Sequence, residues 1–136
     1  MTVGSQIIVI LGPTASGKSA LAMAVAERLG AEILSVDSMQ VYRGMDIGTA
    51  KPSLEEQQRV RHHLIDVVAP NESFAVSQFV NRADEVIADA KARGVTLVAT
   101  GGTPMYYKSL FEGLFEGPSA DDSLRAQLNL SLIHIS

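Results

Sequence analysis

The chain has 136 residues, 46% of them hydrophobic and 19% charged, a composition typical of one globular domain and not of a disordered tail. The absence of cysteine excludes disulfide bonds and thiolate metal sites, and the net charge of −4 argues against a continuous basic face for nucleic acid. No run approaches the ~20 apolar residues of a membrane span, and no basic leader precedes the first apolar run, so we expect a soluble, cytoplasmic protein.

Extended and helical patterns alternate along the chain. In order, we expect a strand over 7–11, a helix over 19–29, a strand over 33–36, a short helix over 53–62 opened by a capping box, a strand over 64–68, a longer helix over 79–94, a strand over 95–99, and helices beginning near 104 and 121. The first helix carries Leu21, Val25 and Leu29 on one face, and Gly30 is its stop. Strands that alternate with helices pair in parallel through right-handed crossovers. The sequence therefore predicts an α/β fold, with ligands at the carboxyl ends of the strands.

The stretch "GPTASGKS", residues 12–19, directly follows the apolar run "IIVIL" and precedes the first predicted helix. It matches the pattern Gly-x-x-x-x-Gly-Lys-Ser, whose glycines let backbone N–H groups turn toward phosphate oxygens. Lys18 can neutralise a terminal phosphate, and the Ser19 hydroxyl can bind Mg²⁺. We expect all of its residues to bind the phosphates: Gly12, Pro13, Thr14, Ala15, Ser16, Gly17, Lys18 and Ser19. Because such a cradle contacts only phosphate oxygens, it fits a diphosphate as well as the tail of ATP.

Two more polar residues follow predicted strands. Asp37 opens the aperiodic segment "DSMQVYRGMDIGTAKP", which predicts a long functional loop. A carboxylate beside a phosphate site can act as a general base or bind Mg²⁺, although a helix cap or a turn is the alternative. Thr103, in "GGTPMYY", could donate a hydrogen bond to a leaving-group oxygen, but Gly-Gly-Thr is also an ordinary turn.

The remaining polar residues favour structural interpretations. His62 and His63 are adjacent, so their side chains point in different directions, and no partners at metal-ligand spacing are evident. Four basic residues are expected on the solvated surface, where one or two could touch a phosphate-bearing substrate: Arg43, Lys51, Arg59 and Arg61.

The C-terminal residues "LSLIHIS" break the polar, helical pattern of "DDSLRAQLN" before them. A terminal strand is one interpretation. We favour the other, in which the gene product is truncated and residues 130–136 are not native.

Taken together, five segments resemble the tRNA dimethylallyltransferase (isopentenyl-diphosphate:tRNA transferase) family: "GPTASGKS", "SVDSMQVYRGMDIGTAKP", "HHLIDV", "GGTPMYYKSLFEGL" and "PSADDSLRAQL". They occur in the family's order and span nearly everything from residue 7 to about 128. The resemblance implies a P-loop NTPase-like core, a parallel sheet flanked by helices. It further implies that the cradle holds the diphosphate of dimethylallyl diphosphate. The dimethylallyl group then passes to the exocyclic amine of the adenosine 3′ of the tRNA anticodon, and diphosphate is released.

The resemblance also implies roles for single residues. Asp37 matches the proposed base that takes a proton from the amine, and Thr103 matches a contact to the diphosphate. Lys18, with Mg²⁺ at Ser19, would stabilise the departing diphosphate. Contacts to tRNA are expected from a further set: Asp37, Ser38, Met39, Gln40, Thr103 and Arg125.

The main departure from the family is length, because the family chain continues with a helical insertion that grips the anticodon stem-loop. We therefore expect a P-loop core over 1–120, the start of that insertion over 121–136, and a monomeric piece that is itself a poor catalyst. Two other classes stay open: a small-molecule or nucleoside kinase that uses ATP, and a non-catalytic binding module. A kinase would normally show an arginine-rich lid, which is not visible in the sequence. A prenyltransferase acting on a free nucleotide is a variant of the leading hypothesis.

Overall fold

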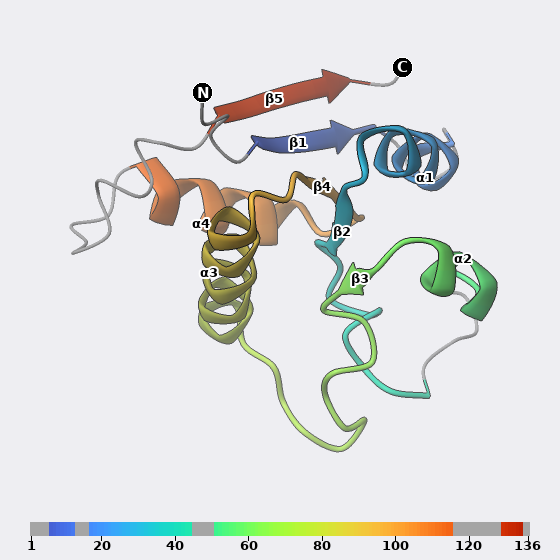
Figure 1. Cartoon of the computed structure of the whole chain (residues 1–136). Helices are drawn as coiled ribbons and strands as arrows, with labels where there is room; N and C mark the ends of the chain where they lie inside the picture. Colours follow the sequence, from blue (N-terminus) through green and yellow to red (C-terminus); the bar gives the residue numbers. More distant parts are fainter. Residues whose placement is uncertain (1–5, 13–16, 45–50, 116–128, 135–136) are drawn as a thin grey trace.

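The computed structural model describes residues 6–12, 17–44, 51–115 and 129–134. Its elements are, in chain order, β1 (Gln6–Leu11), α1 (Lys18–Leu29), β2 (Glu32–Ser35), α2 (Leu54–Arg59), β3 (His62–His63), α3 (Val76–Arg93), β4 (Leu97–Thr100), α4 (Pro104–Phe115) and β5 (Asn129–His134). The strands pair in parallel in the order β3-β2-β4-β1-β5 (Figure 1). The predicted α/β fold with a parallel sheet flanked by helices is confirmed.

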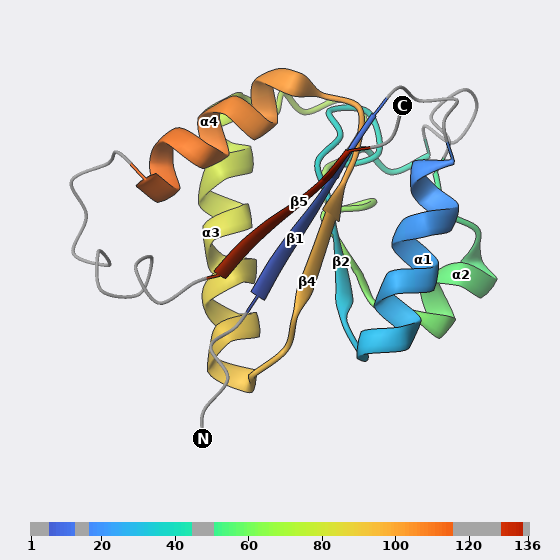
Figure 2. The same ribbon diagram turned by 90° about the horizontal axis from the view of Figure 1, so that it is seen from above.

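Helices cover both faces of the sheet (Figure 2). α3 and α4 lie on one face, whereas α1 and α2 lie on the other. Along β1, Ile7 and Val9 join the core cluster that contains Phe79 of α3, while Ile8 and Ile10 join the cluster built with α1. Burial on both faces explains why this strand is an unbroken apolar run.

α1 packs by a different face from the one predicted. Ala22 and Ala26 are buried against the sheet, whereas Leu29 is 52% exposed. Leu21 and Val25 are only partly buried at the margin of the same cluster. The small alanine side chains bring the helix backbone close to the strands, which is the close packing typical of protein interiors.

The ends of the helices follow the predicted signals with one difference. Gly30 and Gly94 close α1 and α3 in the left-handed conformation, with φ of 63° and 70°. Ser53 and Glu56 form the expected capping box at the start of α2. α2 ends at Arg59, earlier than predicted, because the chain then turns into β3.

The third strand does not lie where the sequence predicted it. A strand was expected over 64–68, but β3 is the dipeptide before that run. Leu64 and Asp66 have φ of 66° and 57°, in the left-handed region, which ends the extended backbone. Leu64 and Val68 of this run are nevertheless buried in the core, and Val68 forms an isolated parallel bridge to Tyr42.

The last described segment of the chain is a strand. Residues 129–134 form β5, which pairs along β1 from Gln6 to Leu11, so the terminal-strand interpretation describes this segment. The helix expected from near 121 lies outside the described residues. That residues 130–136 are not native stays a prediction. Among the helices that the structure describes, none is both long and apolar enough to cross a membrane.

A polar cluster fixes the edge of the sheet at the start of β2. Arg93 donates to both carboxylate oxygens of Glu32, at 2.8 and 2.9 Å, and His63 Nε2 lies 2.7 Å from the same carboxylate. The bond from Arg93, with a smaller contribution from His63, lowers the pKa of Glu32 to about 2. The cluster therefore ties β2, β3 and the end of α3 together.

Candidate functional site

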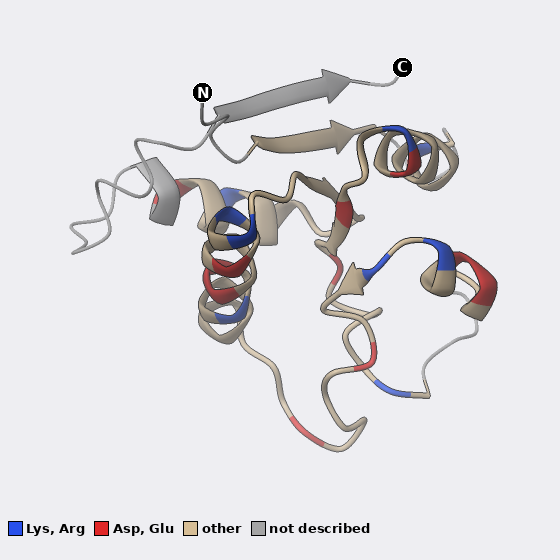
Figure 3. Cartoon of the chain, in the orientation of Figure 1, with Lys and Arg blue, Asp and Glu red and all other residues tan. Residues whose placement is uncertain are grey.

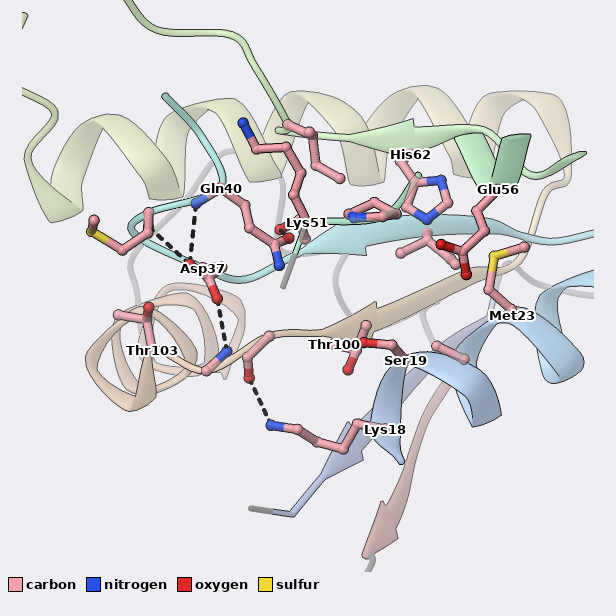
Figure 4. A pocket seen from close by; sticks show the side chains of 18 of the residues that line it. Lys18, Ser19, Met23, Asp37, Gln40, Lys51, Glu56, His62, Thr100 and Thr103 are labelled. Atoms are coloured by element: carbon pink, nitrogen blue, oxygen red, sulfur yellow. Dashed lines mark hydrogen bonds between the residues drawn. The ribbon is translucent and has the colours of Figure 1, made fainter. Parts of the chain in front are cut away.

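The neighbouring strands β2, β4 and β1 end at the same edge of the sheet, and a cavity of about 400 Å³ opens beside them (Figure 4). The structure brings three predicted site segments to its wall. These are Lys18 and Ser19 at the start of α1, the run from Asp37 to Gln40 after β2, and Thr103 after β4. The carboxyl ends of the strands thus carry the site, as predicted.

The start of α1 supplies the basic part of the cavity. Gly17 precedes the helix in a left-handed conformation with φ of 84°, and Ser19 is exposed on the first turn. Lys18 is only 8% exposed, and its Nζ donates a long bond of 3.4 Å to the carbonyl oxygen of Gly101. A buried ammonium group beside a helix N-terminus makes this region favourable for an anion. The predicted phosphate contacts from Pro13 to Ser16 lie outside the described residues.

Asp37 is held in a turn and also faces the cavity. Its Oδ1 accepts hydrogen bonds from the backbone N–H groups of Met39 and Gln40, at 2.8 and 3.1 Å. Its Oδ2 accepts a longer bond of 3.4 Å from the N–H of Gly102 (Figure 4). The turn and the functional interpretation are therefore compatible, because the carboxylate caps its own turn while it lines the cavity.

Thr103 lies against the segment that carries Asp37. The N–H of Ser38 donates to Thr103 Oγ1 at 2.8 Å, and the Thr103 hydroxyl donates to Ser38 Oγ at 3.2 Å. The N–H of Thr103 also donates to the carbonyl oxygen of Val36 at 3.3 Å. A hydroxyl group can rotate its hydrogen toward a new acceptor, so Thr103 remains able to donate to a ligand oxygen in the cavity.

Gly101 directly follows β4, at a position of the site that has no room for a side chain. A Cβ atom on Gly101 would lie 2.2 Å from the carbonyl oxygen of Val36. The Gly101 carbonyl oxygen accepts from Lys18 and, at 3.1 Å, from the hydroxyl of Tyr107 on α4. Burial raises the pKa of Tyr107, so this hydroxyl keeps its proton and remains a donor.

Gln40 is oriented by a residue that the sequence analysis did not single out. Ser35, only 2% exposed, donates from Oγ to Gln40 Oε1 at 2.9 Å. A serine inside the apolar run "ILSV" is the signal that could have found it, because a buried hydroxyl group needs a partner.

Two of the basic residues expected on the surface make specific contacts. The side chain of Lys51 is 7% exposed and forms an ion pair with Asp66, which corrects its assignment to the solvated surface. Arg59 is half-exposed and pairs with Glu27 of α1. Basic and acidic residues lie next to one another on α2 and α3 (Figure 3).

The two histidines have structural partners, as predicted. His62 Nδ1 lies 2.7 Å from the carbonyl oxygen of Val60 and therefore donates to it, while the ring lines the far end of the cavity. Burial lowers the pKa of His62, which favours the neutral imidazole. Arg125, the remaining residue predicted to contact tRNA, lies outside the described residues.

Comparisons with known proteins agree on one family. The family model described as "IPP transferase" matches residues 40–134. The tRNA dimethylallyltransferase of Geobacter metallireducens is 52% identical over 124 residues, which cover 91% of this chain and 40% of that protein. The corresponding enzyme of Janthinobacterium sp. is 53% identical over 129 residues, covering 95% of this chain and 41% of the relative. The chain thus spans about two fifths of the length of these relatives.

Solved structures show the same likeness. A tRNA isopentenylpyrophosphate transferase from Bacillus halodurans superposes with a TM-score of 0.75 at 41% identity, over 88% of this chain and 40% of that one. The tRNA delta(2)-isopentenylpyrophosphate transferase from Staphylococcus epidermidis gives a TM-score of 0.73 at 48% identity, over 78% of this chain and 35% of that one.

Proposed function

Because this chain belongs to the IPP transferase family, we propose that the whole protein transfers a dimethylallyl group from dimethylallyl diphosphate to tRNA. The acceptor is the exocyclic amine of the adenosine 3′ of the anticodon, and diphosphate is released. One observation carries the proposal: a buried lysine at a helix start, a carboxylate and a hydroxyl line one cavity, at Lys18, Asp37 and Thr103. We also propose that the protein acts as a monomer in the cytoplasm.

The reaction breaks the allylic C–O bond of the donor, and the electron pair leaves with the diphosphate oxygen. The amine lone pair forms the new C–N bond. An adenine amine is a poor nucleophile because its lone pair is delocalised into the ring, so removal of its proton as the bond forms assists the reaction. Asp37 is the group in the cavity suited to accept that proton. Lys18 and the Thr103 hydroxyl stabilise the negative charge on the departing diphosphate.

Mg²⁺ fits the oxygen donors available here, since Ser19 and Asp37 line the same cavity. No group of three or more metal-ligating His, Asp or Glu side chains occurs among the described residues. Such a site suits an ion held largely by the phosphates of its substrate. When bound, the ion would supply positive charge to the diphosphate, and Ser19 is the protein group that would hold it.

The test is calorimetric titration of the whole protein, in the presence of Mg²⁺, with dimethylallyl diphosphate, inorganic diphosphate and ATP in separate experiments. We expect both diphosphate ligands to bind and ATP to bind weakly or not at all. Lys18→Ala should weaken binding of both diphosphates by roughly 10-fold or more, the effect of losing a charge-assisted hydrogen bond.

Lys108→Ala is the matched control, because Lys108 is an exposed lysine on α4. Its variant should bind the diphosphates as the parent protein does. A clear preference for ATP would support the kinase hypothesis instead. Equal affinity of the Lys18 variant and the parent would remove the phosphate-cradle assignment.

A further inference from the structure

Lys51 contributes to the wall of the cavity, but its charge is engaged elsewhere. Its ammonium group donates to the carbonyl oxygen of Tyr42 at 3.0 Å and pairs with the Asp66 carboxylate. A buried ammonium group requires such compensation, because removing an unpaired charge from water is strongly unfavourable. A diphosphate in the cavity would have to compete with the Asp66 carboxylate for this cation.

The backbone of Asp66 is also hydrogen-bonded to the segment that contains Tyr42. Its backbone N–H donates to the carbonyl oxygen of Gln40 at 3.0 Å. Asp66 adopts φ of 57°, a conformation that a residue other than glycine adopts at some cost, although aspartate tolerates it better than most. Through this conformation one residue bonds to Gln40 with its backbone and to Lys51 with its side chain.

Further backbone hydrogen bonds join the same two segments of the chain. The N–H groups of Val67 and Val68 both donate to the carbonyl oxygen of Val41, at 2.8 and 2.9 Å. The N–H of Arg43 donates back to the carbonyl oxygen of Val68 at 2.9 Å. Three of the four residues from 40 to 43 are therefore hydrogen-bonded to the segment that follows β3, and Tyr42 lies opposite Val68 in an isolated parallel bridge.

We propose that Lys51 and Asp66 are positioning residues for the acceptor side of the site. They act through residues 40–43, the continuation of the turn that holds Asp37 and Gln40 against the cavity. The proposal rests on the proposed function, in which that turn meets the target adenosine. It assigns to Lys51 no contact with the diphosphate, which in the proposed function is contacted by Lys18 and Thr103.

The experiment compares Lys51→Met with Lys108→Met, a matched change at an exposed lysine, in the whole protein. For Lys51→Met we expect kcat for prenyl transfer to tRNA to fall roughly 10- to 100-fold, as for other small displacements of reacting groups. Its affinity for dimethylallyl diphosphate should stay within about 2-fold of the parent value. Lys51→Arg keeps the charge and should recover part of the lost rate. Lys108→Met should change neither quantity.

Two results would overturn the proposal. Unchanged turnover of Lys51→Met would show that the ion pair does not position the site. Donor affinity weakened by roughly 10-fold or more, with the protein folded, would identify Lys51 as a phosphate ligand. If Lys51→Met does not fold, Asp66→Asn removes the same ion pair and keeps the lysine, and the same readouts apply.

Amide hydrogen exchange tests this proposal independently of the proposed function. In Lys51→Met, the amides of Arg43, Asp66 and Val67 should exchange roughly 10-fold faster than in the parent protein, because local opening becomes easier. Lys108→Met should leave these amides unchanged. If the parent protein transfers no prenyl group, the proposed function fails, and exchange still decides whether Lys51 fastens residues 40–43. Unchanged exchange would contradict the proposal whatever the activity.

Discussion

Ser38 and Thr103 are 65 positions apart in the sequence, yet each donates a hydrogen bond to the other. The backbone N–H of Ser38 donates to Thr103 Oγ1 at 2.8 Å, and the Thr103 hydroxyl donates to Ser38 Oγ at 3.2 Å. The pair joins the turn after β2 to the turn after β4. Thr103 therefore has a structural role in addition to any contact with substrate, and its variants must be chosen to separate the two.

Thr103→Val removes both bonds while it nearly keeps the shape of the side chain. We expect it to lower the free energy of unfolding by about 1–2 kcal/mol, because the Ser38 N–H loses its acceptor. The rate of prenyl transfer should fall roughly 10²- to 10³-fold, as it does when a donor to a developing anion is removed. Thr103→Ser keeps the hydroxyl group and should stay close to the parent protein in both measurements. A Ser variant as poor as the Val variant would show that the methyl group matters, not the hydroxyl.

Asp37→Asn separates the proposed base from the turn. The asparagine oxygen can still accept from the N–H groups of Met39 and Gln40, so the fold should be nearly unchanged. Without a carboxylate to take the proton, the single-turnover rate of prenyl transfer should fall ~10²-fold or more, while affinity for dimethylallyl diphosphate is retained. Asp37→Ala should additionally cost about 1 kcal/mol of stability, because the turn loses its acceptor. A parent-like rate for the Asn variant would remove Asp37 from the mechanism.

Gly101→Ala should be among the most damaging small substitutions in the chain. Its Cβ would lie 2.2 Å from the carbonyl oxygen of Val36, so the ends of β2 and β4 must separate. We expect the free energy of unfolding, measured with urea, to fall by about 3 kcal/mol. In Gly94→Ala the added Cβ meets nothing within 4 Å and only the φ of 70° is unfavourable, so about 1–2 kcal/mol is expected. Equal losses in the two variants would mean that the contact with Val36 is relieved without cost.

Glu32 should make the stability of the protein sensitive to acid. Its pKa is lowered from 4.5 to about 2 in the folded protein, first by the hydrogen bond from Arg93. Between these values the unfolded chain binds more protons, so stability is present above about pH 4.5 and is lost as the pH falls toward 2. Glu32→Gln lacks this contribution and should be less stable at pH 7 by about 1–2 kcal/mol, after allowance for solvent screening.

Thermal unfolding from pH 7 to pH 2 checks this prediction, because the difference between Glu32→Gln and the parent protein should shrink over the acidic range. Glu85→Gln, at an exposed carboxylate of α3, is the control and should show no such convergence. A difference that stays constant with pH would show that the Glu32 cluster contributes packing and not charge.

The parts of this site that the sequence predicted are those encoded by short local patterns. Three of these parts each follow a buried strand: the start of α1, Asp37 after β2 and Thr103 after β4. Parallel pairing places the carboxyl ends of these strands at one edge of the sheet. The buried face of α1 was predicted wrongly, because large residues such as Leu29 were favoured over alanines that pack closer to the sheet. The ion pair between Lys51 and Asp66 could not be predicted, because it depends on a left-handed backbone at Asp66 that no local sequence pattern indicates.

The position of β1 inside the sheet has a consequence for the order in which the chain acquires structure. Ile7 pairs with Leu97 on one side and with Leu130 on the other, so both neighbours of this strand come from the far end of the sequence. A ribosome that has made β1, β2 and β3 has exposed the apolar run before either of its partner strands, β4 and β5, exists. Such long-range pairing slows folding and leaves the run open to association with other chains. The strand that leads into residues 12–19 is thus made before either of the strands that pair with it.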